Sequence, residues 1–169
     1  MTDPDRSGDV LSLAKNLPRN CALVLRTYGR PDISAQAYEL AELAREESWQ
    51  FLVSADPELA DKVDADGVHW PEWALAQINR SDPTRLITAS AHSPRALRRA
   101  STSADAILIS PIFSSQSPSA THPKGVFRAS ALARAVDVPV YALGGITPWT
   151  VKRLQGLGFS GIATVGIAR

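Results

Sequence analysis

Residues 138–148 read Val-Pro-Val-Tyr-Ala-Leu-Gly-Gly-Ile-Thr-Pro, an apolar run that ends in two glycines and a threonine–proline pair. The run over Val138–Leu143 is typical of a strand that is covered on both faces, because side chains of both parities are apolar. Thr147 before Pro148 is typical of a helix start, with the proline at the first helical position. A buried strand that turns directly into a helix is the building unit of a parallel α/β sheet.

The same pattern occurs along the rest of the chain. Further short apolar runs lie at Ala22–Leu25, Phe51–Val53, Gly67–Trp70, Leu86–Ala89, Ala106–Ile109 and Gly161–Val165. Segments of helical periodicity separate them, and Asp56-Pro57 and Ser93-Pro94 repeat the helix-start signal. This alternation of strand and helix predicts βαβ units and a parallel sheet.

A doubly wound sheet and a closed barrel both fit this alternation. The short repeat, roughly twenty residues per unit, favours the barrel. A Gly-rich dinucleotide fingerprint, expected of many doubly wound folds, does not follow the first strand. We therefore predict an α/β fold of the TIM-type (β/α)8 barrel class, as a single domain over residues 1–169.

Composition excludes several classes of function. Lys and Arg number 18 against 17 Asp and Glu, a formal net charge of +1, so no strong field attracts nucleic acid or an anionic membrane. The single cysteine, Cys21, excludes a disulfide framework and a thiolate metal cluster. No apolar run approaches the length of a membrane span, and the N-terminus lacks the apolar core of a signal peptide. A cytoplasmic protein is expected, without nucleic-acid or membrane partners.

The turn after the strand at Val138–Leu143 is a candidate phosphate site. In parallel barrels functional groups gather at the C-terminal ends of the strands, and phosphate often binds after the last two strands. Gly144 and Gly145 let backbone N–H groups approach an anion, and a following helix start favours negative charge. Val165-Gly166, at the end of the last strand, is a candidate second backbone clamp. The alternative interpretation is a tight strand-to-helix turn without a ligand.

The other strand ends carry polar side chains with candidate roles in catalysis. Arg26 closes the first apolar run, and a buried guanidinium needs an anionic partner. Ser90 and His92 follow the run at Leu86–Ala89, and His69 follows Val68. Both histidines are candidate acid/base groups or metal ligands, but no carboxylate cluster lies beside them, so the favoured interpretation is a hydrogen-bonded structural role at the rim.

Sequence motifs at these strand ends occur in the same order and spacing in one known family. The motifs are Ala65-Asp66-Gly67-Val68-His69, Ser90-Ala91-His92-Ser93, Ala104-Asp105, Ser110-Pro111-Ile112-Phe113, Gly125, Ala142-Leu143-Gly144-Gly145-Ile146 and Gly161-Ile162-Ala163. Through them the chain resembles the thiamine-phosphate synthase family, which includes the thiazole tautomerases. The resemblance extends from about Leu23 to Ile167.

The resemblance implies a TIM barrel of thiamine biosynthesis whose ligand is a small phosphorylated heterocycle. True synthases of the family join hydroxymethylpyrimidine pyrophosphate to thiazole phosphate, and Mg²⁺ with basic side chains stabilises the departing pyrophosphate. By this resemblance Arg26 matches the strand arginine and Ser90 the pyrimidine-side serine. The residues that it assigns to substrate and phosphate are Ser115, Ser117, Gly125, Gly144, Gly145, Ile146, Val165 and Gly166.

The metal and pyrophosphate positions depart from the family pattern. An Asn-Asp pair of the family is Ser54-Ala55 here, its second metal aspartate falls on Ala74, its lysines fall on Tyr28 and Pro118, and the tautomerase histidine falls on Pro111. Asp56 and Glu72 are the carboxylates left nearby, at different positions. We therefore assign no metal ligand, and Mg²⁺ is implied only for an active synthase.

Both ends of the chain are short against the family barrel. Met1-Thr2-Asp3 resembles the end of the family's first strand, and Arg169 follows the last strand directly. Most of strand 1 and the last helix are therefore expected to be lacking. Either the true start lies upstream, or a partner subunit of a homodimer or a loose N-terminal segment covers the gap.

Three functional hypotheses follow. The first is a thiamine-phosphate synthase with a rebuilt leaving-group site, whose turnover depends on Mg²⁺. The second is a non-catalytic or regulatory paralogue that binds a phosphorylated thiazole or thiamine phosphate at Gly144-Gly145. The third is another enzyme of small phosphorylated compounds, with His69 or His92 as the acid/base group. We also expect that a β-branched residue at position 145 abolishes phosphate binding and leaves the fold intact.

Overall fold

The structure is a computed structural model that describes residues 1–3, 7–27, 33–115 and 122–165. Its described residues fall into two compact units. The first unit comprises Met1–His69, Asp82–Leu86 and Val165, and the second comprises Trp70–Ser81 and Ile87–Thr164. Each unit is described by itself.

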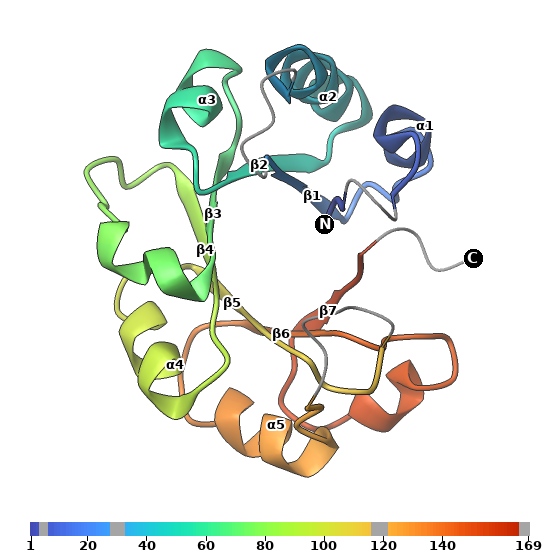
Figure 1. The fold of residues 1–169 in the computed structure, drawn as a ribbon, viewed down its shortest axis with the longest axis vertical. Coiled ribbons are helices and arrows are strands. Elements are labelled where there is room, and N and C mark those ends of the chain that lie inside the picture. Colours follow the sequence, from blue (N-terminus) through green and yellow to red (C-terminus); the bar gives the residue numbers. More distant parts are fainter. Residues whose placement is uncertain (4–6, 28–32, 116–121, 166–169) are drawn as a thin grey trace. The chain divides into compact units, whose positions relative to one another are not determined.

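The first unit is built on parallel strands with helices on one side of them (Figure 1). Its elements are α1 (Val10–Ala14), β1 (Ala22–Arg26), α2 (Ile33–Glu47), β2 (Gln50–Ser54), α3 (Pro57–Lys62) and β3 (Gly67–Trp70), of which Trp70 already belongs to the second unit. The strands pair in chain order, with Leu23 opposite Phe51 and Val53 opposite Val68. Met1–Asp3 lie beside β1, since Thr2 donates its backbone N–H to Val24 O at 2.9 Å.

The second unit repeats this arrangement. Its elements are η1 (Glu72–Gln77), β4 (Leu86–Ser90, of which Leu86 belongs to the first unit), α4 (Pro94–Ala100), β5 (Ala106–Ile109), α5 (Val126–Ala133), β6 (Val140–Leu143), η2 (Val151–Leu154) and β7 (Gly161–Ala163). Its strands pair in parallel, with Ala89 opposite Ile107, Leu108 opposite Tyr141 and Leu143 opposite Ala163. The helices α4 and α5 lie on one side of these strands (Figure 1).

The predicted parallel α/β class is confirmed. Within each unit the strands follow one another in chain order, without the reversal of order that marks a doubly wound sheet. The strands β1 to β5 are buried on successive residues, as in β2, where Phe51, Leu52 and Val53 are all buried, so both of their faces are covered. In β6 and β7 this continuous burial is absent. The single domain over residues 1–169 and the lacking strand and helix remain predictions.

The predicted helix starts are confirmed at two of three places. Asp56 Oδ1 accepts the N–H of Leu59 at 2.9 Å to begin α3, and Ser93 Oγ accepts that of Ala96 at 3.2 Å to begin α4. After Thr147-Pro148, however, the structure has a turn followed by a 3₁₀ helix of four residues, η2. Gln155 ends η2 in an extended conformation, with ψ of 130°, and Gly156 and Gly158 follow with φ of +72° and +83°.

Two aspartates from the family motifs bond to the N-terminal ends of neighbouring strands. Asp66 Oδ2 accepts the N–H of Phe51 at 2.7 Å, and Asp105 Oδ2 accepts the N–H of Ile87 at 2.8 Å. The next residue, Gly67, has no room for a side chain, because a Cβ atom there would lie 2.0 Å from the carbonyl oxygen of Leu86. Both aspartates therefore hold strand beginnings, at the opposite ends from the C-terminal rim.

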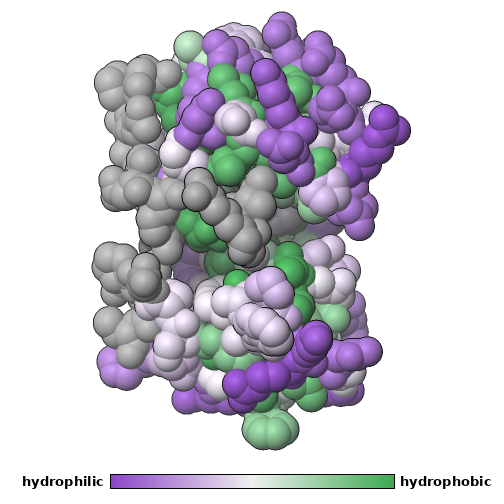
Figure 2. Space-filling view, turned by 90° about the vertical axis from the view of Figure 1, so that its right-hand side faces the viewer, coloured by the Kyte–Doolittle hydropathy of each residue, from purple (hydrophilic) through white to green (hydrophobic). Residues whose placement is uncertain are grey.

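Hydrophilic side chains predominate on the face that Figure 2 shows, with hydrophobic ones between them. In the part of the chain that the structure describes, no helix has the length and apolar character to cross a membrane.

Candidate phosphate site and rim cluster of the second unit

The turn after β6 has the backbone that the sequence predicted. Gly144 and Gly145 have φ of +95° and +67°, a region that residues with a Cβ atom rarely adopt. The Gly145 carbonyl oxygen accepts the hydroxyl of Thr150 at 2.9 Å, and Thr147 Oγ1 accepts the N–H of Thr150 at 3.1 Å. These side-chain bonds hold residues 145–150 in one conformation.

The loop after β5 packs against this turn. Ile112 donates its N–H to Leu143 O and Phe113 donates its N–H to Gly144 O, each at 3.0 Å. A Cβ atom on Gly145 would lie 2.5 Å from the Ser114 carbonyl oxygen. This close approach explains why glycine occupies the position whether or not a ligand binds. The same close approach contradicts our expectation that a β-branched residue at position 145 would leave the fold intact, because its side chain would collide with the loop after β5.

Two N–H groups of the turn remain available for an anion. Among the described residues, no hydrogen-bond acceptor takes the N–H of Gly145 or of Ile146. Consecutive backbone N–H groups in such a turn form an anion-binding concavity. Arg153 on η2 adds a cation nearby, stacked 5.2 Å from the ring centroid of Phe113.

The loop residues assigned by resemblance are described only in part. Ser115 is half-buried, and Ser117 lies outside the described residues. Gly125 has a φ of +73° and donates its N–H to Ile112 O at 3.1 Å, so it shapes the start of α5. Val165 belongs to the first unit and Gly166 lies outside the described residues, so the second backbone clamp remains a prediction.

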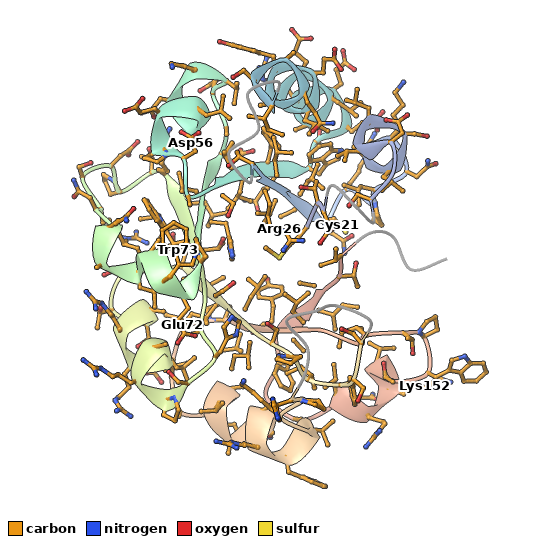
Figure 3. The ribbon with its side chains drawn as sticks, viewed as in Figure 1. Cys21, Arg26, Asp56, Glu72, Trp73 and Lys152 are labelled. Carbon is orange, nitrogen blue, oxygen red and sulfur yellow. The ribbon has the colours of Figure 1, made fainter. Side chains whose placement is uncertain are left out.

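Glu72 joins η1 to the start of α4, and Figure 3 labels it there. Its carboxylate accepts the backbone N–H of His92 at 2.5 Å and the hydroxyl of Ser93 at 3.4 Å. Ser93 is itself the N-cap of α4. Sequence reasoning considered Glu72 only as a stand-in for a lost metal ligand, and missed this role.

The His92 side chain lies among polar and charged groups at the C-terminal ends of β4 and β5. Its Nδ1 lies 3.4 Å from the hydroxyl of Ser110. Partial desolvation of the ring lowers the pKa of His92 below its ordinary value, the Glu72 carboxylate opposes this shift, and the Lys124 ammonium adds to it. Desolvation, followed by the charge of Arg128, likewise lowers the pKa of Lys124, which Glu72 opposes. His92, Ser110, Lys124 and Glu72 are called the rim cluster below.

The remaining candidates sit in different surroundings. Arg26 has the anionic partner that its burial demanded, because Nη2 lies 2.9 Å from Asp3 Oδ2 and Nε donates to Thr2 O at 2.6 Å. Figure 3 labels Arg26 on β1. His69 is only 1% exposed, which favours a structural role over acid/base work at a solvent-facing site. Ser90 is buried at the end of β4.

The residues present do not fit a magnesium site of the kind that the resemblance implies. Ala74, on which the resemblance places a metal aspartate, is fully buried and offers no oxygen ligand from its side chain. Asp56 and Glu72 are engaged by the N–H groups of Leu59 and His92. Within the described ranges, no group of three or more His, Cys, Asp or Glu side chains is placed to hold a metal ion.

Comparison with known proteins gives one consistent result. A family model described as thiamine monophosphate synthase matches residues 15–167. A putative thiamine-phosphate synthase 2 of Aquifex aeolicus is 34% identical over 134 residues, 78% of this chain and 72% of that protein. A thiamine-phosphate synthase of Synechococcus is 30% identical over 83% of this chain, which spans only 41% of that protein's length. A solved thiamine phosphate pyrophosphorylase from Pyrococcus furiosus has a TM-score of 0.78 at 26% identity, over 97% of this chain and 82% of its own, which confirms the predicted TIM-barrel-like class.

Proposed function

Because the chain belongs to the thiamine monophosphate synthase family, we propose that it binds a phosphorylated thiazole, or thiamine phosphate, at the turn after β6. The observation that carries this proposal is the pair of available N–H groups on Gly145 and Ile146 beside two glycines of positive φ. A phosphate oxygen can accept hydrogen bonds from both N–H groups. These bonds replace the hydrogen bonds that the two N–H groups otherwise make to water. Arg153 supplies a positive charge next to the loop that packs on this turn.

The phosphate-binding function is separable from synthase chemistry in this chain. The groups proposed to bind phosphate are backbone N–H groups of the second unit. The substitutions expected at the metal and pyrophosphate positions do not remove these N–H groups. The pyrophosphate-metal positions, in contrast, hold Ser54, Ala55 and Ala74. We therefore propose binding without Mg²⁺-dependent turnover, as a non-catalytic or regulatory member of thiamine biosynthesis.

Thiamine-phosphate synthase activity is the second candidate. The names of the Aquifex, Synechococcus and Pyrococcus relatives favour it. In that case hydroxymethylpyrimidine pyrophosphate and thiazole phosphate are joined with release of pyrophosphate. The leaving group would then have to be held by residues other than those of the family pattern.

One experiment separates the two candidates. Purified protein is incubated with both phosphorylated precursors, with Mg²⁺ and then with chelator, and thiamine phosphate is quantified. Binding of thiazole phosphate is measured in parallel by calorimetry. Saturable binding without turnover supports the first proposal, and turnover that chelator abolishes supports the second. Absence of both binding and turnover would exclude both.

A further inference from the structure

The charged residues of this near-neutral chain are divided unequally between its two units. Among the described residues, the first unit has 6 Lys and Arg against 12 Asp and Glu, and the second unit has 9 against 3. The formal net charge of the described residues is therefore −6 in the first unit and +6 in the second. Two copies of such a chain attract each other when the acidic unit of one copy faces the basic unit of the other.

The second unit also has an apolar groove between η2 and β7. Its volume is about 340 Å³, and the apolar side chains that line it are Val151, Leu154, Phe159 and Ile162. Ile162 is 45% exposed, although it lies in the middle of β7. Lys152, which Figure 3 labels on η2, also lines the groove, and none of the described lining residues is acidic. The groove shares no residue with the turn after β6 or with the rim cluster, so the site described above does not account for it.

The exposed side of α2, in the first unit, carries complementary groups. Tyr38 is 50% exposed, and among the described residues it is the only large hydrophobic side chain of the first unit that is exposed. Glu42 follows Tyr38 by about one helical turn, so the two side chains are neighbours on the helix surface. Glu39 and Glu42 are both exposed, and neither has an ion-pair partner within the described ranges. This side of α2 therefore presents an aromatic ring with unpaired carboxylates beside it.

Charge selects Tyr38 among the exposed aromatic side chains as the one that suits this groove. Trp73, Phe127 and Trp149 are more exposed, but they belong to the second unit, and two positively charged units repel each other. Tyrosine is also among the residues that most often anchor an interface, because its ring buries a large apolar surface. The aromatic anchor and the charges thus favour the same pairing, the acidic unit of one copy on the basic unit of another.

We infer that the groove between η2 and β7 binds a second copy of this chain, whose α2 helix inserts Tyr38 into the groove and places Glu42 beside Lys152. This inference goes beyond the proposed function, because neither surface includes the turn after β6. Each of the two surfaces lies within one unit, and the two surfaces differ, so the contact is heterologous. The chain therefore associates head to tail, and each bound pair keeps one groove and one α2 helix for further copies.

Sedimentation velocity of the full chain at increasing concentration tests this contact. We expect reversible association that weakens when the salt concentration rises from about 0.05 M to about 0.5 M, because salt screens the opposite charges. Tyr38→Ala and Lys152→Glu should each weaken association at least about tenfold, since one removes the anchor and the other reverses a charge of the groove. Arg98→Glu, on the exposed surface of α4, makes the same charge change in the same unit outside the groove. This matched control should change association less than about twofold.

A mixture of the two weakened variants tests that the contact joins two different surfaces. Tyr38→Ala keeps the groove intact and Lys152→Glu keeps the α2 surface intact. At a concentration where each variant alone is monomeric, the mixture should therefore form a one-to-one complex that does not grow further. Circular dichroism confirms that the variants are folded.

Three results would overturn the inference: an unmodified chain that stays monomeric up to about 0.5 mM, an equal loss of association in Arg98→Glu, or a mixture that does not associate. Thiazole phosphate binding to Tyr38→Ala keeps this inference distinguishable from the proposed function. Its affinity should equal that of the unmodified protein, because the donors proposed for phosphate are backbone N–H groups of the turn after β6.

Discussion

The carboxylate of Glu72 and the backbone N–H of His92 are joined by a hydrogen bond of 2.5 Å between residues 20 positions apart. This bond ties η1 to the segment between β4 and α4, and the second Glu72 oxygen reaches Ser93. A single side chain therefore sets the position from which His92 faces Ser110.

Replacement of Glu72 tests this tie. Glu72→Ala leaves the His92 N–H without its acceptor, and we expect a loss of about 1–2 kcal/mol in the free energy of unfolding. Glu72→Gln keeps an acceptor oxygen and should lose less. Urea denaturation measures both, and equal stability of the two variants would contradict the role of the carboxylate.

Glycine substitutions separate backbone strain from close packing. Gly145 and Gly156 have similar φ values, +67° and +72°, but only Gly145 has atoms close to the position of a Cβ. Gly156→Ala should cost about 1 kcal/mol from conformation alone. Gly145→Ala should cost at least about 2 kcal/mol more, because Ser114 and Phe113 must move. Thermal unfolding of the two proteins measures the difference, and equal melting temperatures would refute the packing argument.

The aspartates before β3 and β5 should matter for stability and not for binding. Asp66→Ala and Asp105→Ala each remove the acceptor of a strand N–H, and we expect each to lose about 1–2 kcal/mol. Affinity for thiazole phosphate should stay within about twofold of the unmodified protein, since these residues lie at the strand ends opposite the rim. Asp137→Ala, at an exposed aspartate before β6, serves as the control. A large loss of affinity with intact stability would reverse this assignment.

Lowering the pH should reduce the free energy of unfolding, in part through protonation of the His92 ring. The folded state lowers the pKa of His92, so it prefers the neutral ring. The stability that this provides is present above the unfolded-state value of about 6.5 and is lost as the pH falls through the lower folded-state pKa. His92→Gln should therefore show a shallower loss of stability than the unmodified protein between about pH 7 and pH 5. Urea midpoints in phosphate-free buffers measure this, and parallel curves would contradict it.

Magnesium should leave the isolated protein unchanged. The carboxylates near the family metal positions are engaged by backbone N–H groups, so no tight site is expected to stabilise the folded state. We expect the melting temperature in about 10 mM Mg²⁺ to equal that in chelator within about 1 °C. A rise that saturates with Mg²⁺ and disappears in Glu72→Ala would show that the metal site has been rebuilt.

The sequence alone determined the class of the fold and the position of its elements. All seven predicted strands are present, and β3 and β5 have the predicted bounds. Asp56 and Ser93 cap the helices that they were predicted to begin. These features depend on residues within a few positions of one another, through side-chain parity, proline and capping side chains, so a linear pattern reveals them.

Only the tertiary structure decided what the polar residues do. Arg26 pairs with Asp3, Asp66 holds Phe51, and Glu72 holds His92, although each pair lies 15 or more residues apart in the chain. The partner of a charged side chain is whichever group the fold brings within about 3 Å, and no local pattern encodes that distance. For the same reason the sequence left Glu72 only as a carboxylate near the lost metal positions, while the folded chain uses this carboxylate to position the backbone of a histidine.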